Sequence, residues 1–133
     1  MANLAIQQNT FDHVPADKLT SMIMRLFEHW KLTYAEQAIM LGFSPKTHST
    51  IARYKNGSQA IALDRDTYDR VRFLLSIHKN LRTIFPLNKD LGYAWVKAQN
   101  RTFDGKTPFD IIAQEGFLGL ARVNNYLENY MAG

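Results

Sequence analysis

Apolar residues recur at intervals of three and four along most of the chain, which is the spacing of amphipathic helices. No stretch alternates apolar and polar residues between turn signals, so the sequence predicts no strands. The clearest helical stripe follows Pro15 and consists of Leu19, Met22, Ile23, Leu26, Phe27 and Trp30. The pattern therefore predicts an all-α fold.

Capping signals divide the remainder into six further helices. Thr33 and Glu36 have the spacing of a capping box, and Gly42 is a suitable left-handed residue to end that helix. Pro86 ends the longest helix and is the predicted boundary between residues 1–86 and residues 87–133. The apolar stripe of that helix includes His78, which we interpret as a packing residue. The predicted spans are Ser44 to Asn56, Asp64 to Phe85, about Asn88 to Asn100, Thr107 to Gly116, and Phe117 to about Met131.

Composition and charge narrow the function classes. The chain has no cysteine, which excludes disulfides and thiolate metal sites and favours a cytoplasmic protein. No apolar run is long enough to span a membrane. Residues 1–86 hold 11 Lys+Arg against 7 Asp+Glu, whereas residues 87–133 hold 5 against 5. A basic region joined to a neutral one indicates two different partners, although a mildly basic solvated surface would give the same numbers.

The two helices on either side of Gly42 have the layout of a helix-turn-helix motif. Ala38 is small enough for close packing, Gly42 supplies the turn, and Ile51 is an apolar anchor in the second helix. Hydroxyl, amine and guanidinium groups surround Ile51, and such groups contact phosphates and base edges. The predicted DNA-binding set is Lys46, Thr47, His48, Ser49, Thr50, Arg53 and Lys55.

Two registers of the second helix are open at this point. The turn from Phe43 to Ser49 is about three residues longer than a compact motif needs. The helix could therefore begin at Ser44, with Pro45 in its first turn, or only at Ser49; Arg53 lies on the polar side in both cases. Helix-turn-helix shapes also occur in proteins that do not bind DNA, and a single motif requires a dimer to bind tightly.

Residues 87–133 contain no cluster of titratable side chains at catalytic or metal-binding spacing, no histidine and no Gly-rich phosphate loop. No nucleophile–base pair or cofactor loop can be assembled from the whole chain. The sequence therefore predicts that the protein is not an enzyme and has no catalytic residue, metal site or cofactor.

Large apolar residues are abundant in this same segment. Eleven of them exceed what so short a segment buries alone, which favours an interface. They are Trp95, Phe103, Phe109, Ile111, Ile112, Phe117, Leu120, Val123, Tyr126, Leu127 and Tyr130.

Several motifs in the last third of the chain resemble the toxin-binding segment of the Xre/MbcA/ParS-type antitoxins of RES-Xre type II toxin–antitoxin systems. The resemblance covers roughly Leu32 to Gly133, and its C-terminal motifs are specific. They run from Trp95 to Arg101, from Phe103 to Ile112 and from Ala121 to Leu127, with Gly116 and Gly133, after an upstream stretch from Arg72 to Pro86.

The resemblance implies an N-terminal Xre-like helix-turn-helix bundle, a long connecting helix and a small C-terminal toxin-binding unit. It implies an antitoxin that occludes a RES-domain toxin, either NAD-degrading or ADP-ribosyl-transferring, and represses its own operon. The expected partners are this toxin, operator DNA and a second copy of the chain, with no membrane and no small-molecule substrate. A stand-alone dimeric helix-turn-helix regulator remains the alternative. By resemblance, the toxin-binding residues are Arg122, Asn125, Tyr126, Asn129, Tyr130, Met131, Ala132 and Gly133.

Overall fold

The computed structural model describes residues 13–132 of the chain. All regular structure in this range is helical, which confirms the predicted all-α class. The helices are α2 (Ala16–His29), α3 (Tyr34–Met40), α4 (His48–Asn56), α5 (Arg65–Ile84), α6 (Lys89–Ala94), the 3-10 helices η1 (Trp95–Lys97) and η2 (Arg101–Phe103), α7 (Pro108–Glu115) and α8 (Phe117–Ala132).

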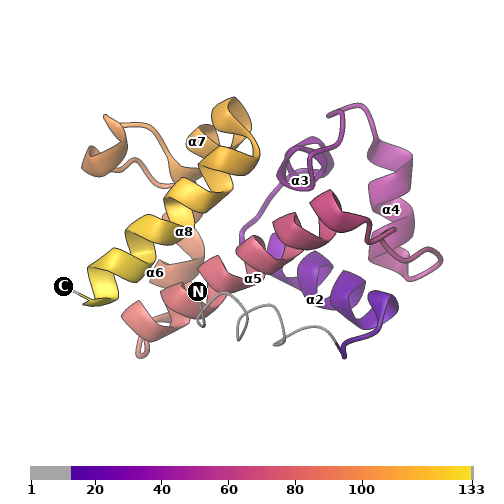
Figure 1. Cartoon of the computed structure of the whole chain (residues 1–133), viewed down its shortest axis with the longest axis horizontal. Helices are drawn as coiled ribbons and strands as arrows, with labels where there is room; N and C mark the ends of the chain where they lie inside the picture. The colour runs from indigo at the N-terminus through magenta and orange to yellow at the C-terminus, as the bar shows by residue number, and fades with distance from the viewer. Residues whose placement is uncertain (1–12, 133) are drawn as a thin grey trace.

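The long helix α5 is shared by two groups of helices. Figure 1 shows α2, α3 and α4 on one side of the molecule, α6, α7 and α8 on the other, and α5 extending between them. Helix α8 packs along α5 and on α7, while α2 packs on α5 and α4. The C-terminal helices therefore find their packing partner in α5, as expected for a segment too short to fold alone.

Local signals set the helix starts as predicted. The Thr33 hydroxyl accepts a hydrogen bond from the Glu36 amide, and the Glu36 carboxylate accepts one from the Thr33 amide. Thr107 and Asp110 form a second capping box, with Pro108 in the first helical position. Such reciprocal caps satisfy backbone amides that have no partner within the helix. Gly42 has φ of 80°, the left-handed conformation predicted for the turn.

A buried polar group sets the register between α5 and α8. The Asn124 side-chain oxygen accepts hydrogen bonds from the Ser76 hydroxyl at 2.9 Å and from the Asn80 amide at 3.0 Å. The Asn124 amide donates to Glu128 at 3.0 Å. Because buried polar groups are costly when unpaired, this network favours one alignment of the two helices.

Gly119 allows α8 to approach α7 closely. A Cβ atom at this position would lie 2.5 Å from the Ile111 carbonyl oxygen and 2.9 Å from the Ile112 Cα. Both neighbours are backbone atoms, so a larger residue could be accommodated only if the helices moved apart.

The predicted helix from Asn88 to Asn100 is too long. It ends at Ala94, continues as the 3-10 helix η1 to Lys97, and Ala98 is extended. This change of geometry accompanies the burial of Val96, and Trp95 is half-buried against the core. Tertiary packing has therefore overridden a helical pattern that the sequence alone would continue.

Candidate functional site

The structure resolves the register of the predicted DNA-binding helix. Helix α4 begins at His48, so the register that begins at Ser44 is wrong and the later one is close to the observed start. Residues 44–47 form a separate turn, in which the Thr47 amide and hydroxyl both donate to the Ser44 carbonyl oxygen. Pro45 and Lys46 lie in this turn, outside the helix.

The predicted DNA-binding residues do not all share one face of α4. Ile51 and Tyr54 are buried. Burial raises the pKa of Tyr54 above its usual value, and the nearby charge of Arg53 offsets this only in part. At about 100° per residue, Ser49 and Arg53 lie opposite this buried face. Asn56, which the sequence-based set missed, lies on that outward face as well. Lys46 and His48 are exposed nearby, whereas Thr47 and Thr50 are half-buried.

Two members of the set have side chains held by neighbours. The Arg53 guanidinium donates hydrogen bonds to Gln59 at 2.8 Å and to the Thr50 hydroxyl at 3.2 Å. Lys55 lies to one side, with its ammonium 5.8 Å from the centre of the Tyr34 ring. Arg53 is therefore an exposed cation on an ordered side chain, while Lys55 points toward α3.

The predicted toxin-binding residues of α8 divide into two sets. Arg122, Asn125 and Asn129 are exposed and follow one another at intervals of three and four, so they share the outward face. Arg122 is paired with Glu115 at 2.6 Å and its guanidinium lies 5.5 Å from the Phe103 ring centre. This face is a row of polar groups on an ordered helix.

The second set continues the inward stripe of α8. Tyr126 is half-buried, with its ring centre 6.2 Å from that of Trp95 and 5.5 Å from that of Phe103. Leu127 is buried one residue later. Tyr130 and Met131 are both exposed at the end of the helix. Ala132 is the last helical residue, and Gly133 lies outside the described residues.

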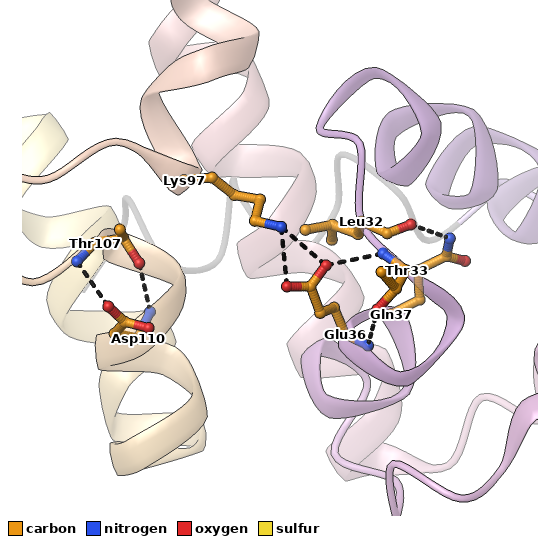
Figure 2. A network of polar contacts seen from close by, with 7 residues as sticks. All are labelled: Leu32, Thr33, Glu36, Gln37, Lys97, Thr107 and Asp110. Carbon is orange, nitrogen blue, oxygen red and sulfur yellow. Dashed lines mark hydrogen bonds and ion pairs between the residues drawn. The ribbon is translucent and has the colours of Figure 1, made fainter.

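An ion pair connects the two groups of helices. Figure 2 shows Lys97, at the end of η1, reaching Glu36 in the first turn of α3. The Lys97 ammonium lies 3.0 and 2.9 Å from the two carboxylate oxygens of Glu36. Burial raises the pKa of Glu36, but the hydrogen bonds from Thr33 and Lys97 outweigh this and hold it below its usual value. Glu36 therefore caps α3 and also binds the C-terminal group.

A stack of three rings lies at the same junction. The Tyr93 ring of α6 lies parallel to His29 of α2 at 4.4 Å and to His78 of α5 at 6.0 Å, measured between ring centres. Burial lowers the pKa of His78, and Arg82 and His29 lower it further. The lowered pKa favours the neutral form of His78, and its stacking on Tyr93 agrees with its interpretation as a packing histidine.

The exposed apolar side chains of the C-terminal segment are mostly not the ones that the sequence analysis counted toward an interface. Of the eleven large apolar residues counted in the C-terminal segment, only Tyr130 is exposed, and the other ten are buried or half-buried. The sequence reasoning missed three exposed leucines: Leu87 at 99% exposure, Leu91 at 51% and Leu118 at 74%. Leucine is so common in helical stripes that its exposure could not be read from the pattern.

Two kinds of site are not found among residues 13–132. No group of three or more His, Asp or Glu side chains in this range could hold a metal ion. None of the helices in this range is long and apolar enough to cross a membrane.

Comparison with known proteins assigns the C-terminal group of helices to a described domain family. Residues 80–133 match the family model described as the antitoxin Xre/MbcA/ParS C-terminal toxin-binding domain. The match begins within α5 at the buried Asn80, whereas the sequence placed its boundary at Pro86. An uncharacterized protein of Sinorhizobium fredii (strain NBRC 101917 / NGR234), y4oB, is 31% identical over 120 residues, which cover 90% of this chain and 88% of the relative. This chain therefore belongs to the Xre/MbcA/ParS-type antitoxins, and the matched segment is their toxin-binding domain.

Proposed function

We propose that this antitoxin binds and occludes a RES-domain toxin through the outward face and the C-terminal end of α8. The observation that carries the proposal is the exposed row of Arg122, Asn125 and Asn129, followed by Tyr130, within the segment that matches the toxin-binding domain. The RES fold of the partner and its use of NAD follow from the family resemblance of the C-terminal motifs.

The chemistry of α8 suits insertion into a polar cleft. Asn125 and Asn129 each offer an amide donor and a carbonyl acceptor from one face of the helix. Tyr130 adds an aromatic ring with a hydroxyl at its tip, a combination common in interface anchors. Arg122 is held by Glu115, so binding would cost little side-chain entropy at that position. Occupation of the NAD-binding cleft by this helix end would exclude the dinucleotide.

We further propose that α3 and α4 form a helix-turn-helix that represses the antitoxin's own operon. Helix α4 exposes only polar and charged side chains, including Ser49, Arg53 and Asn56 on its outward face. Arg53 is the best-placed group for a base or phosphate contact, because its guanidinium is exposed and already ordered. So short a helix would need a second copy of the chain and a two-half-site operator.

Deletion of Tyr130 to Gly133 tests the toxin proposal. We expect the truncated chain to lose neutralisation of the RES-domain toxin of the proposed pair, and to keep operator binding. Co-expression, growth assays and size-exclusion chromatography with light scattering would measure both the rescue and the stoichiometry. Arg53→Ala is the matched control, since it should lose operator binding and keep neutralisation. Full neutralisation by the truncated chain would rule out occlusion by the helix end.

Salt dependence tests the division between two partners. Residues 1–86 carry the net charge of the chain, so operator affinity should fall steeply as salt is raised. Toxin affinity should change much less, because residues 87–133 carry equal numbers of acidic and basic groups. Equal slopes in fluorescence anisotropy and calorimetry would contradict this division.

A further inference from the structure

We propose that the toxin also contacts Leu87 and Leu91, which extend the exposed end of α8 at Tyr130 and Met131 into an apolar end patch of four residues. This proposal rests on the proposed toxin-binding function and names a part of the interface outside the polar face of α8. The patch would receive an apolar segment of the toxin, such as a loop or helix that presents large hydrophobic side chains.

The inward stripe of α8 continues beyond the helices that cover it. Leu120, Val123 and Leu127 are buried against the core. Tyr130 and Met131 follow Leu127 at the helical spacing of three and four, yet they are 62% and 40% exposed. Among residues 13–132, the apolar face of α8 therefore stays largely exposed over its last turn, where Tyr130 keeps a ring contact with Tyr126.

The end of α5 lies at the same end of the molecule. Helices α5 and α8 run in the same direction, because Phe73 stacks on Phe117 and Asn80 binds Asn124, 44 residues ahead in each case. The same offset places the turn after α5 level with the last turn of α8, and Figure 1 shows the two helices ending together. Leu87 in this turn is 99% exposed and Leu91 in α6 is 51% exposed.

A single exposed leucine is ordinary, but this grouping is not. Six large hydrophobic residues are exposed in residues 13–132, and four of them lie at this one end. All four lie in the segment that matches the toxin-binding domain. The patch is also continuous with the end of α8 that is proposed to enter the toxin. An apolar group beside a polar face is the arrangement of an interface core and its rim.

The double variant Leu87→Ser with Leu91→Ser tests the proposal. Both side chains project into solvent, so folding should be retained; the single Leu87→Ser variant provides a second test at the fully exposed position. Leu118→Ser is the matched control, since Leu118 is 74% exposed in the same domain but lies near the opposite end of α8. The probe is the purified RES-domain toxin of the proposed pair, with binding followed by calorimetry.

We expect the double variant to weaken toxin binding about 10- to 100-fold, and Leu118→Ser to leave it within about twofold. Unchanged affinity in the double variant, combined with loss on deleting Tyr130 to Gly133, would overturn the patch and leave the proposed function standing. Unchanged affinity in both would overturn the two together. If the double variant altered only the mass of the free antitoxin in light scattering, the patch would be a self-association surface and the proposal would be wrong.

Discussion

The surface of α4 and the end of α8 differ in the chemistry that they expose. Helix α4 buries Ile51 and Tyr54 and exposes only polar and charged groups, as a surface for a polyanion requires. The end of α8 exposes Tyr130 and Met131, which continue its buried stripe. The α4 surface exposes no large apolar side chain to water. The end of α8 does, and a protein partner that covered Tyr130 and Met131 would remove this apolar area from water.

The comparison also separates two kinds of energetic dependence. Contacts with nucleic acid through Arg53 and its neighbours would depend on charge and on salt. Contacts through the end of α8 would depend on buried apolar area and on the rigidity of the helix that carries them. Changes in one region should therefore leave the partner of the other largely unaffected, apart from effects through the junction at Lys97 and Tyr93.

The largest expected effect comes from Gly119→Ala. The added Cβ would meet the Ile111 carbonyl oxygen at 2.5 Å, so α8 would have to shift on α7. We expect a loss of about 1–3 kcal/mol in the free energy of unfolding, together with weaker toxin binding. Gly92→Ala is the matched control, because its Cβ would meet its nearest neighbours at 3.6 Å, an ordinary contact distance. Urea unfolding measures both; equal stability of the two variants would mean that α8 does not depend on this close approach.

The second effect concerns α4 alone. Arg53→Ala removes a guanidinium that Gln59 and Thr50 hold in place, and we expect operator affinity to fall about 10-fold or more. Lys55→Ala should cost less, since Lys55 lies toward the Tyr34 ring. Fluorescence anisotropy with an operator fragment would rank the variants. A larger loss for Lys55→Ala would reverse our assignment of the DNA-facing side.

Local signals account for the part of the fold that the sequence predicted well. Thr33 with Glu36, and Gly42, act within three or four residues, so their effects do not depend on distant packing. The early end of α6 was not predicted because it depends on tertiary contacts. The end of α6 at Ala94 accompanies the burial of Val96 and the pairing of Lys97 with a residue 61 positions away.

The candidate sites also combine features that the local sequence predicts with features that only tertiary contacts decide. A helical pattern marked α8 as amphipathic, and the polar row of Arg122, Asn125 and Asn129 is exposed. The pattern could not show where α5 and α7 stop covering α8. It therefore counted Phe103 and Leu120, which are buried, among the apolar residues taken to favour an interface, and it missed Leu87 and Leu91, which are exposed. Exposure of an apolar side chain is set by its neighbours in space.

A smaller effect is expected at the junction between the two regions. Lys97→Met removes the partner of Glu36, and for a partly exposed pair we expect a loss of about 0.2–1 kcal/mol. Because the pKa of Glu36 is lowered in the folded state, its contribution is present above the usual value of 4.5 and is lost as pH falls through the folded pKa. Glu36→Gln keeps a capping side chain but removes the charge. Its stability relative to wild type should improve between pH 6 and pH 3; a constant difference would contradict the assignment.

The smallest effect is a pH dependence at His78. Burial lowers its pKa below the ordinary 6.5, so the unfolded chain binds a proton that the folded chain does not. Stability should therefore be fully present above pH 6.5 and should decline as pH falls below it toward the folded pKa. His78→Gln should flatten this slope, whereas His48→Gln, exposed in α4, should leave it unchanged. Urea midpoints between pH 5 and pH 8 would measure the slopes. An identical slope in all three proteins would contradict the assignment of this pH dependence to His78.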